Sequence, residues 1–402
     1  MTEQSQPHAQ TPKIGLILPG GGARAAYQIG VLRAVAELLP PRAPSPFQII
    51  SGTSAGAINA TGLACSADRF RAAVASLDRV WRDFHVDQVY RADKISMLRS
   101  GLQYFLALAS GGWLLPPPRS LFDNEPLRTL LARHIAFDGI AASIAAGALE
   151  ALVVSASGYT SARSVAFFES STVTDAWARA RRAGQPARIS LDHLMASVAV
   201  PFLFPPVPMA REYYGDGSMR QATPFSPAIH LGADRLLVIG TRDKPQGNGT
   251  EGAASPSFGQ IFGYMLDALF MDGLYTDLER IQQVNALVAH CGGELPVADG
   301  RTLRHIDLMV ILPSRDVAAL AREHTMAFPR TLRVLLRTMG AFNRGGAQLM
   351  SYLMFEAAYT RELIALGYDD AMARAPELAA FLRGERLAST GATALLHALA
   401  GA

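Results

Sequence analysis

Ser54 is the candidate nucleophile of this chain. It is the centre of Gly52-Thr53-Ser54-Ala55-Gly56, a G-x-S-x-G pattern that follows an apolar run from Phe47 to Ile50. A run of mostly small, helix-compatible residues follows from Ala55 to Ala64, so the sequence predicts a strand, a tight turn and a helix, with the serine at the corner. Glycines relieve the crowding of such a turn, and the helix N-terminus favours developing negative charge. We therefore predict a nucleophile elbow at residues 52–56, although a Gly- and Ala-rich chain can match the pattern by chance.

A second candidate feature is the run Gly20-Gly21-Gly22, which follows an apolar strand predicted over Lys13 to Leu18. Such a loop can approach a ligand closely and present N–H groups to an anion. A dinucleotide site would want an acidic residue at the tip of the second strand, which ends at Ser51-Gly52 instead. A P-loop would need a Gly-Lys-Ser/Thr sequence, which is absent. We favour an oxyanion hole that faces Ser54 over glycines used only for a tight turn.

A nucleophilic serine also needs a base. None of the nine histidines lies in a Gly-rich loop after a predicted strand, and His193 and His230 fit helix positions better. Asp216 follows two tyrosines and lies between Gly215 and Gly217, which predicts a carboxylate at the tip of a strand or hairpin with little bulk around it. An ordinary Asp-Gly turn would give the same pattern.

The elements that would position these residues alternate along the chain. Short apolar strands followed by helices predict parallel βαβ units. Residues 66–135 are predicted to be mostly helical, with a break at Pro116–Pro118. Further strands are predicted over Leu152–Ser157, Ser164–Phe168, Arg235–Gly240 and Ile306–Leu312, and helices over Ala25–Leu39 and from about Pro224 to Leu231.

A Gly-, Pro- and Ser-rich segment predicts a division of the chain. We predict a disordered N-terminus over residues 1–12, a catalytic domain over 13–243 and a linker over 244–256. A mainly helical C-terminal region over 257–402, which could pack on the catalytic domain, carries no catalytic motif. We expect it to serve as a cap, an oligomer interface or a membrane-facing surface.

Composition sets outer limits on the function. The 402 residues are 50% hydrophobic, enough for one large domain or two moderate ones. A net charge of +3 with 18% charged residues argues against a nucleic-acid partner. Two cysteines, Cys65 and Cys291, cannot build a disulfide framework, so a reducing compartment fits. No secretory signal or membrane-spanning run is recognisable, and we expect a cytoplasmic protein that can contact a membrane peripherally.

Two segments could contact lipid. Leu102–Leu115, with Tyr104, Phe105 and Trp113, is a candidate cap or interfacial segment, and a buried helix is the alternative. Arginines recur at helical spacing among leucines within Pro329–Arg344. That pattern suits a basic amphipathic helix on an anionic membrane, but a helix packed on the domain with a solvated arginine face is the favoured interpretation.

These motifs together resemble the patatin-like phospholipases. Gly20–Arg24 is similar to their glycine-rich oxyanion motif, residues 52–56 to their nucleophile elbow and Asp216-Gly217 to their catalytic D-G. The resemblance extends over roughly residues 13–242. The stretches Ala196–Phe202, Pro205–Val207, Ser120–Asp123 and Pro126-Leu127 are also similar to that family.

The resemblance implies a three-layer α/β/α fold with a mostly parallel central sheet, and a Ser–Asp dyad without histidine. It implies neither a metal nor a cofactor. Ala25 and Ser218 depart from the commonest family residues, and both are small, so they bear on substrate range more than on chemistry. The implied site comprises Ser54 as nucleophile, Asp216 as general base, Gly20, Gly21, Gly22 and Arg24 at the oxyanion hole, Gly52, Thr53, Ala55 and Gly56 in the elbow, and Gly217 and Ser218 in the base motif.

The implied function is lipid acyl hydrolysis, by a phospholipase or esterase that forms an acyl-enzyme at Ser54. A lipid acyltransferase that uses the same dyad is one alternative. A non-enzymatic lipid-binding regulatory protein is another, which the intact Ser54 and Asp216 disfavour. The expected partners are a lipid ester and a membrane surface.

Overall fold

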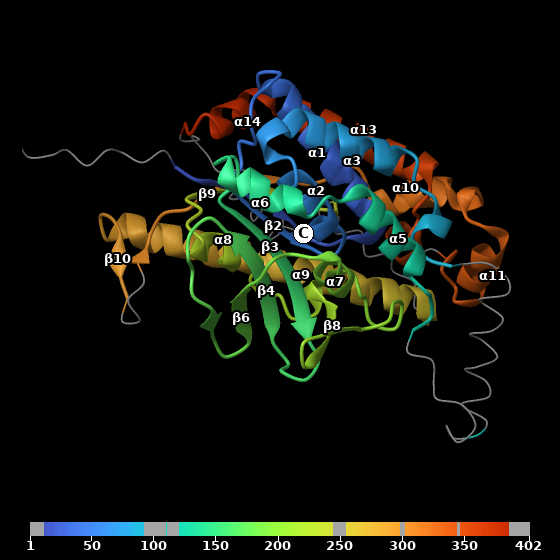
Figure 1. The fold of residues 1–402 in the computed structure, drawn as a ribbon. Coiled ribbons are helices and arrows are strands. Elements are labelled where there is room, and N and C mark those ends of the chain that lie inside the picture. Colours follow the sequence, from blue (N-terminus) through green and yellow to red (C-terminus); the bar gives the residue numbers. More distant parts are fainter. Residues whose placement is uncertain are drawn as a thin grey trace, which may run out of the picture.

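A ten-stranded mixed sheet forms the centre of the computed structural model, in the order β12-β9-β1-β2-β3-β4-β6-β5, with β8 paired to β3 and β7 to β8 (Figure 1). The structure describes residues 12–91, 110, 120–243, 255–297, 302–343 and 346–385. The strands of this sheet are β1 (Ile14–Leu18), β2 (Ile49–Thr53), β3 (Ala151–Gly158), β4 (Ser164–Ser170), β5 (Trp177–Ala178), β6 (Arg182–Pro186), β7 (Val207–Met209), β8 (Glu212–Asp216), β9 (Arg235–Ile239) and β12 (Asp307–Ile311); β10 (Leu295–Pro296) and β11 (Thr302–Leu303) form a separate pair.

The central strands run parallel. β12, β9, β1, β2 and β3 form a continuous parallel set, whereas β4 and β8 both pair antiparallel to β3. β1, β2 and β9 are buried at every position, as expected for parallel strands covered on both faces. The predicted α/β fold with a mostly parallel central sheet is therefore confirmed.

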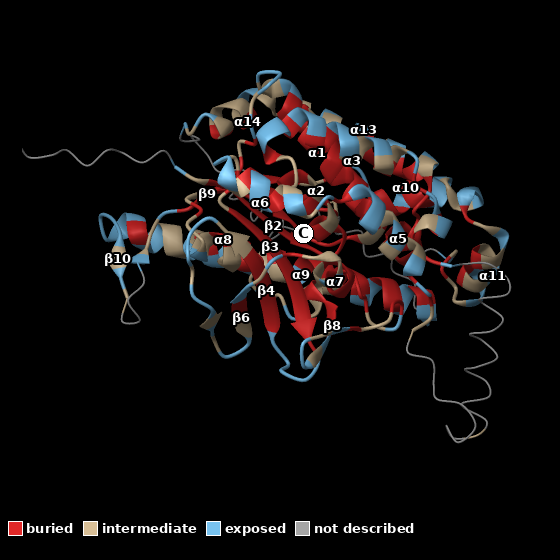
Figure 2. Cartoon of the chain, in the orientation of Figure 1, coloured by how far each residue is buried: buried red, intermediate tan, exposed pale blue. Residues whose placement is uncertain are grey.

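Helices enclose the sheet. Figure 1 shows α1, α3 and α13 gathered above it and the long α9 crossing the molecule below them. Figure 2 shows that the strands and the inward helix faces are buried, while the outer helix faces are exposed. The helices are α1 (Ala26–Leu38), α2 (Ala55–Ala64), α3 (Phe70–Arg82), α5 (Glu125–His134), α6 (Asp138–Ala145), α7 (Leu191–Ser197), α8 (Ser226–His230), α9 (Phe258–His290), α10 (Val317–Glu323), α11 (Arg330–Thr338), α12 (Ala347–Leu353), α13 (Ala357–Met372) and α14 (Ala375–Leu382).

The C-terminal region shares the core of the residues before it. β12 extends the sheet beside β9, and α13 packs along α1. One apolar cluster runs from Ile14 to Phe381. The predicted domain boundaries stay a prediction. Residues 1–11 and 244–254, which hold most of the predicted disordered N-terminus and of the predicted linker, lie outside the described residues.

Of the two candidate lipid-contacting segments, the structure describes mainly the second. All of Leu102–Leu115 except Ser110 lies outside the described residues, as do Pro116–Pro118 and Arg344. In α11, Leu332 and Leu336 are buried in the core while Arg330 and Arg337 are exposed. This packing is the one that the favoured interpretation of the arginine pattern expects.

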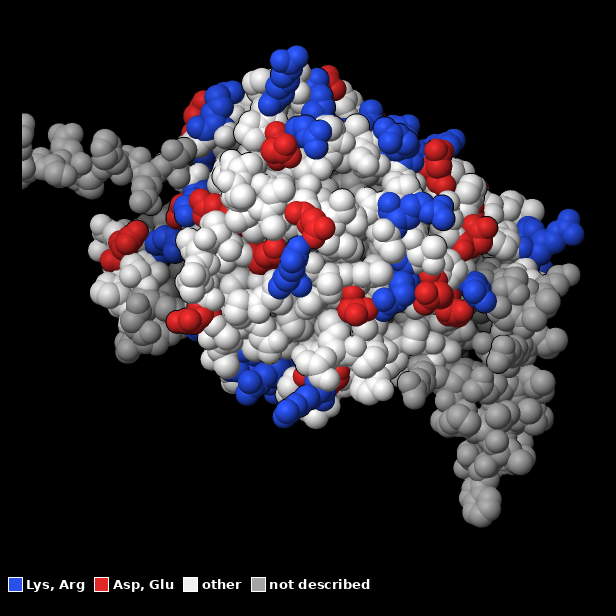
Figure 3. Space-filling model, in the orientation of Figure 1, with Lys and Arg blue, Asp and Glu red and all other residues white. Residues whose placement is uncertain are grey.

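Charge is dispersed over the visible surface. Figure 3 shows basic and acidic side chains interspersed on this face, without a broad patch of one sign (Figure 3). No helix in the described part of the chain combines the length and apolar character needed to cross a bilayer.

Candidate active site

Ser54 lies on a strained turn between β2 and α2. Its φ of 53° is in the left-handed region that non-glycine residues rarely adopt. A Cβ on Gly52 would lie 2.5 Å from the Gly56 carbonyl oxygen, and one on Gly56 would lie 2.0 Å from the Leu18 oxygen. Ser54 donates its N–H to Ser197 Oγ at 2.9 Å. The strand, tight turn and helix expected from the sequence are therefore present, and both glycines are needed for the tight packing of the turn.

Asp216 lies at the end of β8, where antiparallel pairing with Ala156 of β3 brings it toward the elbow. Its side chain is fully buried, and Oδ1 accepts the Ser218 N–H at 2.9 Å. A Cβ on Gly217 would lie 2.3 Å from the Ser155 oxygen and 2.9 Å from Thr53 Cγ2. The base motif therefore packs directly against the elbow strand.

Two opposing influences act on the Asp216 carboxyl. Burial raises its pKa to about 6, while the Ser54 hydroxyl and the N–H and hydroxyl of Ser218 act in the opposite direction. The Ser54 hydroxyl thus lies beside the carboxyl. Oδ2, however, has no partner that satisfies hydrogen-bond geometry in the described structure. A buried carboxylate oxygen left without a partner beside a serine is a ready proton acceptor.

The glycine loop follows β1 at the same edge of the sheet. Gly20 accepts the Thr241 hydroxyl at 2.8 Å, and a Cβ on Gly22, whose φ is 54°, would lie 2.4 Å from the Tyr352 oxygen. Within the described chain, the N–H groups of Gly21 and Gly22 donate to no other group. The Arg24 N–H instead donates to the Gly21 oxygen at 3.1 Å. Gly21 and Gly22 are therefore the better-placed candidate oxyanion donors.

The Arg24 side chain connects this loop to the C-terminal helices. Its guanidinium is buried, with Nη1 3.0 Å from Asp267 Oδ1 and Nε 2.8 Å from Ser351 Oγ. It also lies over the Tyr352 ring at 3.8 Å and donates to Gln348. Elements far along the chain thus hold the loop in place.

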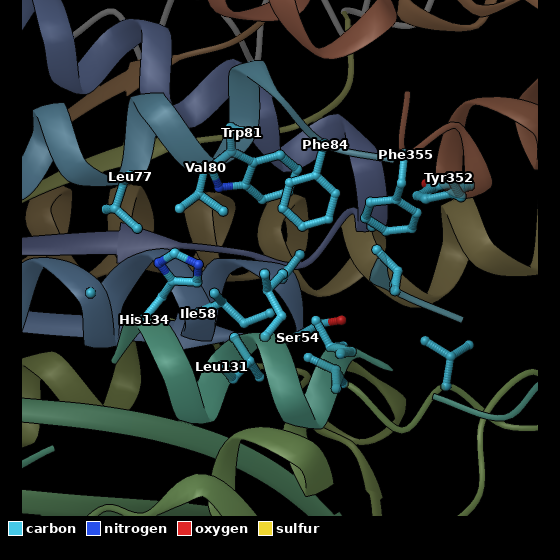
Figure 4. Close-up of a pocket in the computed structure, with 18 of the residues that line it drawn as sticks. Ser54, Ile58, Leu77, Val80, Trp81, Phe84, Leu131, His134, Tyr352 and Phe355 are labelled. Atoms are coloured by element: carbon cyan, nitrogen blue, oxygen red, sulfur yellow. The ribbon is translucent and has the colours of Figure 1, made fainter. Parts of the chain in front are cut away.

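An apolar pocket opens at Ser54 (Figure 4). It encloses about 1060 Å³ including its open mouth, and Gly22 and Ser54 lie on its wall. Figure 4 shows Tyr352 and Phe355 at one end and Leu77 and His134 at the other. The aliphatic and aromatic lining comes from α2, α3, α5, α9 and the segment around α12: Ile58, Leu77, Val80, Trp81, Phe84, Leu127, Leu130, Leu131, Leu266, Phe270, Tyr352, Leu353 and Phe355 among others.

Among the described residues, no histidine is hydrogen-bonded to Ser54 or Asp216. His85 and His324 contact glutamates, and His193 contacts Ser190. His134 lines the pocket, but no hydrogen bond of the described structure joins it to Ser54 or Asp216. His8 and His397 lie outside the described residues.

Several residues at the site have roles that their sequence context does not predict. Ser197 bridges the Ser54 N–H and the Ser155 oxygen, the latter at 2.7 Å, and Gln221 accepts the Thr53 hydroxyl at 2.6 Å. Asp267 is the buried partner of Arg24. The sequence does offer a signal for Asp267: it is the one charged residue in the otherwise largely apolar run Ile261–Phe270, and a carboxylate buried there needs a charged partner.

The fold and the site define a class of α/β proteins in which a serine, on the turn that follows a parallel strand, lies at the wall of an apolar pocket. Residues 16–229 match the sequence model of the family described as patatin-like phospholipase, and the chain belongs to that family. Membership implies lipid acyl hydrolase activity, and the family consists generally of serine hydrolases.

Other comparisons are weaker. The crystal structure of VipD from Legionella pneumophila is 13% identical with a TM-score of 0.32, over 92% of this chain and 67% of that one. The crystal structure of the type III effector protein ExoU is 14% identical with a TM-score of 0.28, over 83% of this chain and 70% of that one. A comparison with curated protein sequences gives no match.

Proposed function

We propose that the protein hydrolyses carboxylic esters of lipids through an acyl-enzyme at Ser54, with Asp216 as general base. The observation that carries the proposal is the unpartnered, buried Oδ2 of Asp216 beside a strained serine that opens on an apolar pocket. Such a pocket suits an acyl chain, and the Ser54 hydroxyl at its wall, with Asp216 buried behind it, suits attack on the ester.

Ser54 Oγ attacks the ester carbonyl carbon while its proton passes to Asp216, and the N–H groups of Gly21 and Gly22 stabilise the oxyanion. Each such donor typically contributes about 3 kcal/mol to transition-state stabilisation. The intermediate collapses, and the leaving alcohol takes the proton from Asp216. Water then attacks the acyl-enzyme, gives a proton to Asp216, and releases the fatty acid as Ser54 Oγ regains that proton.

Peripheral contact with a lipid surface is part of this proposal. Phe258, Ile261, Tyr264 and Met265 of α9 are all exposed large apolar side chains. The same helix lines the pocket through Phe270. A membrane against this end of α9 would bring lipid close to the site.

The test is release of fatty acid from a panel of lipid esters in mixed micelles. Ser54→Ala should lower turnover by more than about a thousandfold, because the nucleophile is removed. Ser171→Ala, an exposed serine away from the pocket, is the matched control and should keep wild-type turnover. Near-normal turnover by Ser54→Ala would contradict the proposal. Transfer of the acyl group to an added alcohol in preference to water would identify a transferase instead.

A further inference from the structure

A second, polar depression adjoins the turn that carries Asp216. We call it the basic hollow, and it is bounded by the turn around β5 and β6, by the segment after Asp216 and by one side of α9. Its charged lining in the described chain consists of four arginines and one carboxylate: Arg179, Arg181, Arg182, Arg220 and Asp272. No part of the mechanism above uses it.

The hollow is close to the candidate dyad. Ser218, which lines it, donates its N–H to Asp216, and Gln221, which also lines it, accepts the hydroxyl of Thr53 beside the nucleophile. Helix α9 separates the two cavities: Phe270 faces the apolar pocket and Leu269 faces the hollow. The apolar pocket and the basic hollow therefore lie on either side of the candidate dyad.

They converge at the glycine loop. A Cβ on Gly20 would lie 2.5 Å from the Phe270 ring and 3.0 Å from Ser218 Oγ. One wall of each cavity thus meets the loop that presents the candidate oxyanion donors. An ester held at this loop would have its acyl chain on the apolar side and its alcohol portion toward the arginines.

The charge of the hollow selects the ligand chemistry. Arg181 and Arg220 are exposed, and Arg182 donates to the Thr223 hydroxyl. Guanidinium groups bind phosphate oxygens through paired, charge-assisted hydrogen bonds. Arg181 and Arg220, both exposed, outnumber Asp272, the one carboxylate of the described lining, which favours a headgroup with net negative charge over one that carries a compensating ammonium.

We propose that the basic hollow binds the phosphate-bearing headgroup of the substrate lipid and makes the enzyme prefer anionic to zwitterionic phospholipids. This inference rests on the proposed hydrolase function and adds to it the class of headgroup.

The experiment compares kcat/KM for two soluble, monomeric substrates, dihexanoyl phosphatidylglycerol and dihexanoyl phosphatidylcholine. Monomers remove any preference that arises from attraction to a charged membrane surface. We expect the wild-type protein to prefer the phosphatidylglycerol. Arg181→Gln and Arg220→Gln should each lower the preference about fivefold, the effect of losing one exposed charge-assisted contact.

Controls separate a local from a general effect of charge. Arg211→Gln removes an exposed arginine from the turn between β7 and β8, outside the hollow, and should keep the wild-type preference. Arg220→Lys retains the charge without the planar fork and should keep part of the preference. Melting curves for each variant check that the fold is intact.

The outcomes are distinct. A wild-type protein without preference, variants that keep it, or an equal loss in Arg211→Gln would each overturn the headgroup site. Inhibition by inorganic phosphate that the arginine variants abolish, with the lipid preference unmoved, would show a free-phosphate site and also overturn it. Failure of the wild-type protein to cleave either lipid or any other ester would contradict the proposed function, and the headgroup site with it.

Discussion

At the scale of the residue, the decisive feature is the environment of Asp216. A carboxyl with an ordinary pKa would be a weak base, and one buried without polar contacts would stay protonated at neutral pH. Burial raises the pKa of this carboxyl to about 6, with contacts from Ser54 and Ser218 opposing the rise. Asp216 is therefore ionised at neutral pH yet basic enough to take a proton from serine.

This pKa predicts the acid limb of the pH profile. Only the ionised carboxylate can act as base, so kcat/KM should be level above the pKa of about 6 and fall as the pH drops through it. At pH 5 the rate should be about a tenth of its plateau, because roughly one molecule in ten is then ionised. The measurement is kcat/KM for an uncharged ester between pH 4.5 and 8. A rate that stays level down to pH 4.5 would contradict the role of Asp216.

Which residues could be predicted depended on how local their role is. Ser54 and Asp216 could be predicted from the glycines that flank them. Those positions require glycine because close backbone packing leaves no room for side chains there. The partners of Ser197 and Asp267 could not be predicted, because Ser54 and Arg24 lie 143 and 243 positions away in the chain. Only the folded chain brings these pairs together.

At the scale of the element, helices α9 and α12 act as a clamp on the glycine loop. Asp267 on α9 contacts Arg24 and also accepts the Tyr352 hydroxyl at 2.6 Å. Arg242 lies 3.7 Å from the same carboxylate. The loop thus depends on helices outside the residues that match the family.

We predict that Asp267→Asn weakens both stability and catalysis. It leaves the buried Arg24 charge without its carboxylate, which typically costs about 3–5 kcal/mol. The loop would lose its fixed position, so kcat should fall about tenfold while KM changes little. Denaturant unfolding and steady-state kinetics measure the two effects.

Glu279→Gln is the matched control for that variant. Glu279 lies on the same helix but is exposed, so its replacement should alter neither quantity. Wild-type stability in Asp267→Asn would show that the ion pair is not a clamp. A large rise in KM with unchanged kcat would assign Asp267 to substrate binding instead.

The sequence predicts where several strands lie but not the direction in which each strand runs. The apolar runs at β1, β2, β3, β9 and β12 were recognisable because buried parallel strands are continuously apolar. The run at β4 was recognisable because its first five residues are buried. The antiparallel placement of β8 against β3 was not, since side-chain alternation does not encode direction. That placement is what brings Asp216 to the elbow.

At the scale of the whole molecule, the C-terminal region is part of the structure that forms the site. It supplies β12 to the sheet, packs α13 on α1, and contributes Leu266, Phe270 and Tyr352 to the apolar pocket. These contributions in the described structure are packing contacts and the Arg24–Asp267 pair, which a short sequence motif does not predict.

A chain that ends at residue 243 should therefore lack cooperative unfolding and lipid hydrolysis, because its core would be opened along α1 and β9. Thermal unfolding and fatty-acid release are the measurements. A chain that ends at residue 385 keeps every described C-terminal helix and is the matched control. A 1–243 chain that melts cooperatively and hydrolyses lipid would show that the residues before the predicted linker fold and act alone.

The central claim is that Asp216 activates Ser54. The most direct measurement is the rate at which a fluorophosphonate labels the protein, with the modified residue located by peptide mass spectrometry. We predict that the wild-type protein is labelled at Ser54 alone and that Asp216→Asn slows this labelling by at least about a hundredfold while the fold is retained. Labelling of Asp216→Asn at the wild-type rate, or of the wild-type protein at another serine, would contradict the account.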